Sequence, residues 1–140
     1  MKQIPVIFWT GTGNTQMMAD VIAAAINAAG AEAVVKNVSE ITADEAAGYD
    51  ALALGCPAMG AEVLEECEFE PFFTELEGKL AGKKVALFGS YGWGGTYMQD
   101  WEARVKDAGA TLVADGVLAL GAPDDEAMAK LAEAGKLLAE

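Results

Sequence analysis

The chain has 140 residues, of which 53% are hydrophobic, and its 22 acidic and nine basic side chains give a formal net charge of −13. This apolar content can build a core, so we expect one domain over residues 1–140 and exclude a disordered chain. The negative charge disfavours nucleic acid and anionic membranes as partners and favours basic protein surfaces. No apolar run approaches the roughly 18 residues of a membrane span, and no secretory leader is visible, so we expect a cytoplasmic protein.

Histidine is absent, and the chain has two cysteines, Cys56 and Cys67. Without histidine and without a C-x-x-C pair, we expect no zinc or iron–sulfur site, because such sites are built from those ligands. The usual proton acceptor of a nucleophilic triad is also missing. A disulfide is not expected in a cytoplasmic chain.

Short apolar runs alternate with segments of helical periodicity along the chain. The predicted strands cover residues 6–9, 31–37, 50–55, 84–88 and 111–120, with Gly116 as the place for a break in the last. The predicted helices cover residues 14–29, 71–80 and 97–108, a short helix within 39–47, and a final helix that Asp124 caps. Strands that alternate with helices build a parallel sheet covered on both faces, so the sequence predicts an α/β fold.

The loop after the first predicted strand has the character of a phosphate-binding loop. It reads Thr10-Gly11-Thr12-Gly13-Asn14-Thr15 and runs directly into the first helix, at the sheet edge where ligands bind. Its glycines permit close backbone approach, its hydroxyl and amide groups can bond an oxyanion, and the helix offers N–H groups. It has no lysine or arginine, unlike the loop of nucleotide hydrolases, and Gln16 breaks the G-x-G-x-x-G pattern of dinucleotide sites. The alternative is an ordinary glycine-rich turn with a helix cap.

Two further loops follow the third and fourth predicted strands. In the segment from Cys56 to Glu62, Gly60 allows the Met59–Gly60 peptide to take two orientations. In the segment from Ser90 to Thr96, Trp93 stands between glycines, which predicts an indole that stacks on a flat ligand. The alternative for Trp93 is a surface indole that covers its own loop. Together the three loops predict a flat ring that bears one phosphate arm.

Three motifs occur in the order and spacing typical of flavodoxins: T-G-T-G-N-T at 10–15, L-G-C-P-A-M-G at 54–60 and L-F-G-S-Y-G-W-G at 87–94. Over nearly its whole length, the chain resembles the short-chain flavodoxins of anaerobic bacteria. The resemblance implies a three-layer, doubly wound parallel sheet of five strands in the order 2-1-3-4-5, with FMN bound at its edge. It also implies an electron carrier and not an enzyme, one that shuttles mainly between semiquinone and hydroquinone at low potential.

The resemblance assigns a role to each loop. Residues 10–15 would hold the FMN phosphate, Met59 and Trp93 would cover the two faces of the ring, Glu62 would accept a hydrogen bond from N3, and residues 90–92 would pass the pyrimidine edge. The implied cofactor-binding residues are Thr10, Gly11, Thr12, Gly13, Asn14, Thr15, Pro57, Ala58, Met59, Gly60, Glu62, Ser90, Tyr91, Gly92, Trp93 and Gly94. The chain departs from the family pattern at Thr10, where serine is usual, and at 94–97, which is one residue shorter.

Two features of these residues would tune the potential. A flipped Met59–Gly60 peptide would accept a hydrogen bond from flavin N5–H in the reduced states only, which favours the neutral semiquinone. The apolar slot and the nearby acids would disfavour the anionic hydroquinone, with desolvation outweighing the exposed charges. The implied partners are basic surfaces of redox enzymes such as pyruvate oxidoreductase, hydrogenase or a ferredoxin-type reductase, met by a monomeric carrier.

Three other protein classes are alternatives to an electron carrier. A signalling receiver domain needs acids where this chain has Phe8-Trp9 and Leu54-Gly55, and we reject it. A small phosphatase needs a cysteine loop that ends in arginine, which the segment after Cys56 lacks. A flavin-dependent quinone or NAD(P)H reductase remains as the alternative function.

Overall fold

The computed structural model describes residues 2–9, 13–57, 68–91, 97–120 and 123–140. The strands are β1 (Gln3–Phe8), β2 (Glu32–Asn37), β3 (Ala51–Gly55), β4 (Lys84–Tyr91), β5 (Thr111–Leu112) and β6 (Val117–Leu120). The helices are α1 (Asn14–Ala28), α2 (Ala43–Ala47), α3 (Phe69–Glu77), α4 (Tyr97–Asp107), α5 (Asp125–Ala139) and the 3-10 helix η1 (Val38–Glu40). Within these residues, no helix combines the length and the apolar character that crossing a bilayer requires.

All paired strands of the sheet run parallel, in the order β2-β1-β3-β4-β5. β6 also pairs with β4, farther along that strand, from Phe88 to Tyr91. The predicted fifth strand is therefore two short strands, separated by the segment that contains Gly116. The predicted strand order and the predicted break are both confirmed.

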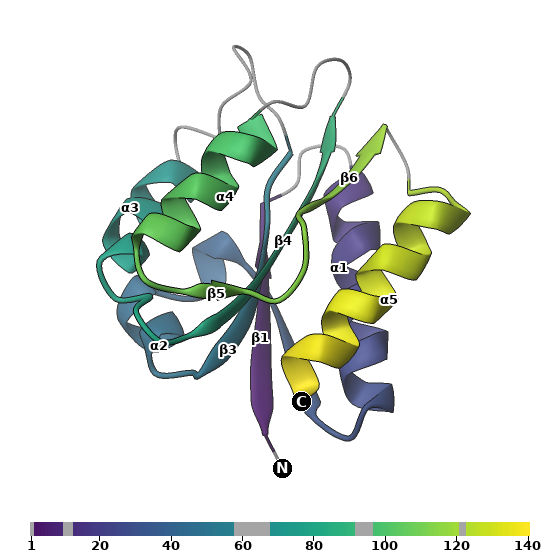
Figure 1. Ribbon diagram of the computed structural model, residues 1–140, viewed down its shortest axis with the longest axis horizontal. Coiled ribbons are helices and arrows are strands. Elements are labelled where there is room, and N and C mark those ends of the chain that lie inside the picture. Colours follow the sequence, from purple (N-terminus) through teal and green to yellow (C-terminus); the bar gives the residue numbers. More distant parts are fainter. Residues whose placement is uncertain (1, 10–12, 58–67, 92–96, 121–122) are drawn as a thin grey trace.

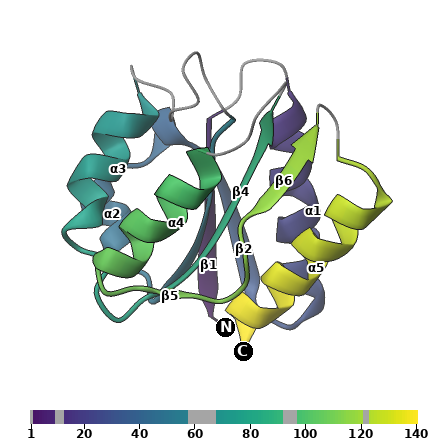
Figure 2. The ribbon, with the colours of Figure 1, turned by 45° about the horizontal axis from the view of Figure 1, so that its top comes forward.

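The helices cover the two faces of the sheet unequally. Figures 1 and 2 show α1 and α5 together on one face and α2, α3 and α4 on the other. Successive strand residues alternate between the two cores, as in β3, where Ala53 packs under α1 and α5 and Leu52 packs under α3 and α4. This alternation follows from the two-residue period of a strand.

Three predicted boundaries need correction. α3 begins at Phe69 and not at Pro71, because proline is tolerated in a first turn whose N–H groups have no helical partner. β1 begins at Gln3, so Pro5 lies inside it, in the part that precedes pairing with β3 at Val6. β4 continues through Ser90 to Tyr91, which the sequence assigns to a loop, because β6 supplies pairing partners for them.

Helices α3 and α4 are fixed to one another by Arg104. Its guanidinium donates to both carboxylate oxygens of Glu70, at 2.7 and 2.9 Å, and to both oxygens of Glu77, each at 3.1 Å. The guanidinium carbon also lies 4.7 Å from the centre of the Phe73 ring. Since α3 follows residues 58–67 and α4 follows residues 92–96, this contact holds together the helices that succeed two of the ligand loops predicted from the sequence.

The Arg104 contact predicts a pH-dependent stability. Its hydrogen bond to Glu70 holds the pKa of that carboxyl below its usual value. A depressed carboxyl pKa stabilises the fold above the ordinary value of about 4.3, and the contribution is lost as the pH falls through the folded-state pKa. Arg104→Met, which keeps an apolar stem over Phe73, should therefore lower the free energy of unfolding at pH 7 by about 1 kcal/mol and by much less at pH 3.

Urea unfolding followed by circular dichroism at both pH values measures this difference. Lys79→Met is the matched control, because it removes only the exposed Lys79–Asp44 pair, whose atoms lie 3.4 Å apart. An equal loss in Arg104→Met at pH 7 and pH 3 would show that the ion pair contributes nothing to stability.

Candidate functional site

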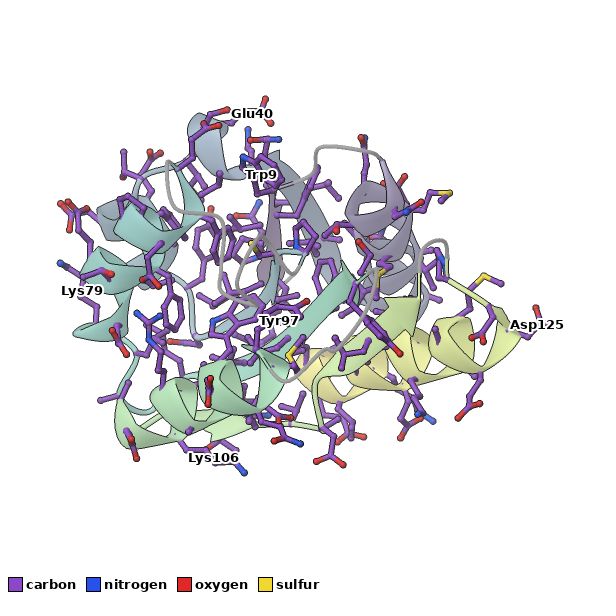
Figure 3. The ribbon with its side chains drawn as sticks, turned by 90° about the horizontal axis from the view of Figure 1, so that it is seen from above. Trp9, Glu40, Lys79, Tyr97, Lys106 and Asp125 are labelled. Carbon is purple, nitrogen blue, oxygen red and sulfur yellow. The ribbon has the colours of Figure 1, made fainter. Side chains whose placement is uncertain are left out.

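The carboxyl ends of β1, β3 and β4 meet at one edge of the sheet, where α1 and α4 also begin (Figure 1). The described residues at this edge come from the starts and ends of all three predicted ligand loops. Seen from above, Tyr97 lies near the centre of the molecule and Trp9 lies nearer its margin, beside Glu40, whereas Lys79, Lys106 and Asp125 lie at the periphery (Figure 3). Hydrogen bonds between the described ends of these loops hold this edge together.

The start of α1 is built to receive an anion. Gly13, the residue before the helix, has φ +94°, a left-handed conformation that glycine adopts readily. No side chain caps α1 among the described residues, and its first turn carries no acid. By contrast, Thr42 caps α2 and Asp124 caps α5 through their side-chain oxygens. The first N–H groups of α1 have no acceptor within the helix, so they suit an oxyanion.

Thr15 joins the end of the first loop to the start of the third. Its side chain is 1% exposed, and its hydroxyl oxygen lies 3.3 Å from the hydroxyl oxygen of Ser90, which is 6% exposed. Either hydroxyl can donate this hydrogen bond. The structure thus brings together two of the predicted site residues, one from the start of α1 and one from the end of β4. Asn14 and Tyr91 are half-buried next to them in the chain.

Tyr97 joins the end of the third loop to the start of the second. Its hydroxyl donates a hydrogen bond of 2.8 Å to the carbonyl oxygen of Cys56. Both residues are buried, and the Cys56 sulfur lies 3.5 Å from the carbonyl oxygen of the predicted site residue Pro57. Burial raises the pKa of the Tyr97 hydroxyl, and the neighbouring Cys56 side chain adds to the effect. The hydroxyl therefore remains a proton donor at neutral pH.

Trp9 joins the start of the first loop to the end of the second. Its indole N–H donates to the Oε1 atom of Glu68 at 3.2 Å, and its backbone N–H donates to the carbonyl oxygen of Gly55 at 3.0 Å. With the Thr15–Ser90 and Tyr97–Cys56 contacts, this bond completes a set that we call the loop-base hydrogen bonds. Each of the three loops is connected to both of the others through its described ends.

The remaining predicted site residues lie outside the described residues. They are Thr10, Gly11, Thr12, Ala58, Met59, Gly60, Glu62, Gly92, Trp93 and Gly94. Their roles remain predictions.

Sequence reasoning missed Trp9 and Tyr97 as contributors to this edge. It placed Cys56 in the second loop and Glu68 near the site, but predicted no contact that joins the loops for either. Trp9 was assigned to the first strand and Tyr97 to a helix start, and neither position carries a motif. The available signal was their place beside the three motifs, since residues that flank loops at one sheet edge are brought close together.

Comparisons with known proteins agree with this geometry. The flavodoxin family model matches residues 6–135. The flavodoxin of Clostridium beijerinckii is 48% identical over 135 residues, which cover 96% of this chain and 97% of that protein. The flavodoxin of Megasphaera elsdenii is 48% identical over 116 residues, covering 82% of this chain and 85% of that protein. The solution structure of the two-electron reduced Megasphaera elsdenii flavodoxin has a TM-score of 0.90 and 44% identity, covering 97% and 98% of the two chains.

These similarities extend over nearly the whole chain, and they confirm both the resemblance and the strand order implied by it. They favour an electron carrier over a flavin-dependent reductase of the same fold. The chain belongs to the flavodoxin family, whose members bind FMN and carry electrons instead of catalysing a reaction of their own.

Proposed function

We propose that this chain is a low-potential, one-electron carrier that holds one FMN non-covalently at the carboxyl edge of β1, β3 and β4. The observation that carries the proposal is the start of α1, with its left-handed Gly13, a first turn free of acids and, among the described residues, no side-chain cap. The chemistry of this donor set fits a phosphate monoester, because neutral N–H and hydroxyl groups satisfy its oxygens without a cation. FMN, when bound there, supplies two successive one-electron steps.

The phosphate is assigned to residues 10–15. Asn14 and Thr15 occupy the first turn of α1, where backbone N–H groups point along the helix axis toward the ligand. The Thr15 hydroxyl lies beside that of Ser90, so one pair of hydroxyls borders both the phosphate region and the end of β4. This pair is the described link between the phosphate end and the ring end of the proposed site.

The ring is assigned to the second and third loops. We propose that Met59 and Trp93 cover its two faces, that Glu62 accepts a hydrogen bond from N3, and that Pro57, Ala58 and the 90–94 segment border its edges. The Met59–Gly60 peptide offers its carbonyl oxygen as acceptor for the proton on N5. Support comes from the described bases of both loops, which Tyr97 and Cys56 connect.

Charge supports docking to basic partner surfaces. The net charge is −13, and three lysines are engaged at the opposite, amino-terminal edge of the sheet. Lys2 and Lys84 donate to the carbonyl oxygen of Glu140, and Lys83 donates to that of Tyr49. We propose that a monomeric carrier in the cytoplasm meets redox enzymes such as pyruvate oxidoreductase, hydrogenase or a ferredoxin-type reductase with its flavin edge.

The proposed function predicts that the chain distinguishes FMN from riboflavin. When apoprotein is added to each flavin, it should quench the fluorescence of FMN at a protein concentration at least about a hundredfold lower than it needs to quench riboflavin. The reason is that only FMN offers the phosphate. Dithionite reduction of the FMN complex should proceed in two separate one-electron steps in the visible spectrum. Equal affinities, or a single two-electron bleach, would contradict the proposal, the latter in favour of the reductase.

A second prediction concerns the Thr15 hydroxyl. Thr15→Val keeps the side-chain shape but removes the donor, so the dissociation constant for FMN should rise about tenfold while that for riboflavin stays unchanged. Fluorescence titration measures both. Thr111→Val is the matched control, because Thr111 is exposed in β5 and pairs with Lys84 at the far edge. A rise of equal size for FMN and riboflavin would remove Thr15 from phosphate binding.

A third prediction concerns the Met59–Gly60 peptide. Gly60→Val raises the cost of a positive φ at residue 60, so the midpoint potential of the first one-electron step should fall by about 40–80 mV. Spectroscopic titration with dithionite and reference dyes measures it. Gly78→Ala is the matched control, since Gly78 has φ −73° and a methyl group there meets nothing within 4 Å. An unchanged potential in Gly60→Val would exclude this peptide from the mechanism.

A further inference from the structure

The Tyr97 hydroxyl lies where two of the three ligand loops approach each other. Tyr97 is the first residue of α4, and Cys56 is the residue that follows β3. Their hydrogen bond of 2.8 Å is buried, with Tyr97 2% and Cys56 0% exposed. No motif in the sequence distinguishes this tyrosine, yet it ends the 94–97 segment, in which the chain departs from the family pattern.

The surrounding backbone is shaped to admit this bond. Gly89 of β4 lies between the two partners, and a methyl group there would lie 2.1 Å from both the Cys56 carbonyl oxygen and the Tyr97 hydroxyl oxygen. Any side chain at position 89 would displace one of them. The Cys56 amide in turn donates to the carbonyl oxygen of Phe88 at 3.1 Å. The bond therefore crosses β4 at its glycine and connects β3 directly to α4.

The connected positions flank the two predicted faces of the flavin. Cys56 precedes Met59 by three residues, and Tyr97 follows Trp93 by four. We propose that Tyr97 is a positioning residue of the FMN site, whose hydroxyl fixes Cys56, at the start of the second loop, to the start of α4, which follows the third loop. The inference rests on the proposed function, since it concerns how the FMN site is held.

The Tyr97–Cys56 bond differs from the other loop-base hydrogen bonds. Trp9 and Glu68 meet at the exposed surface, where water competes for both groups, and Thr15 and Ser90 are themselves assigned to the ligand. Tyr97 is assigned no ligand contact, so its effect on FMN must pass through the Cys56 carbonyl. Burial raises the pKa of its hydroxyl above the ordinary value for tyrosine, so the donor stays protonated at neutral pH.

Tyr97→Phe removes only the hydroxyl and tests this role. The dissociation constant for FMN should rise about two- to tenfold, as expected for one hydrogen bond. The midpoint potential of the first one-electron step should fall, because the Met59–Gly60 peptide is held less firmly in its acceptor orientation. Fluorescence titration of the apoprotein measures the affinity, and dithionite titration of the FMN complex measures the potential. Tyr49→Phe, at the amino-terminal end of β3, is the matched control and should leave both unchanged.

A complementary variant keeps the hydroxyl and so remains informative if Tyr97→Phe does not fold. Site-specific 3-fluorotyrosine at position 97 makes the hydroxyl a stronger donor, and it should shift the first potential in the direction opposite to Tyr97→Phe. If Tyr97→Phe folds, binds FMN and matches the unmodified chain in affinity and in potential, or if 3-fluorotyrosine leaves the first potential unchanged, the hydroxyl does not position the site and the inference is overturned. Failure of the unmodified chain to bind FMN would instead overturn the proposed function, and this inference with it.

Discussion

The proposed FMN site has to bind a dianionic phosphate within a strongly acidic protein and without a basic side chain in the loop. We propose that the start of α1 meets this requirement with neutral groups, because its first N–H groups have no helical acceptor, its dipole presents a positive end and the Thr15 hydroxyl lies in its first turn. A helix start can serve as an anion site only if Gly13 keeps its left-handed turn and if no carboxylate occupies the first turn, and both conditions are met.

The loop-base hydrogen bonds explain how three separate loops can act as one site. Parallel strands bring their carboxyl ends to one edge, but strand pairing alone leaves the loops independent beyond the last ladder bond. Trp9–Glu68, Thr15–Ser90 and Tyr97–Cys56 connect the loops in a closed ring of contacts. Arg104 also connects α3 to α4, the helices that follow the second and third loops, through its hydrogen bonds to Glu70 and Glu77. The loop-base hydrogen bonds and the Arg104 contacts therefore fix the ends of the three loops relative to one another.

Local signals in the sequence predicted the alternation of strands and helices and the capping of α5 by Asp124, whereas the strand order was implied by the flavodoxin resemblance. The phosphate-binding role of residues 10–15 remains a prediction. Sequence reasoning misplaced the end of β4, since the extension to Tyr91 depends on pairing with β6 about thirty residues later. It also missed the hydrogen bond from Tyr97 to the Cys56 carbonyl oxygen, because a side chain that bonds a distant carbonyl leaves no periodic or motif signal. Such contacts are set by tertiary structure alone.

We propose that neutral groups at the start of α1 bind the phosphate of FMN. A two-dimensional amide NMR titration of the apoprotein with FMN, together with the phosphorus signal of the bound cofactor at several pH values, tests this assignment. We predict downfield shifts for the Asn14 and Thr15 amide protons and a phosphorus signal that no longer responds to pH near neutrality. Unmoved amides at the start of α1, with a phosphate that titrates as it does in free FMN, would contradict the claim.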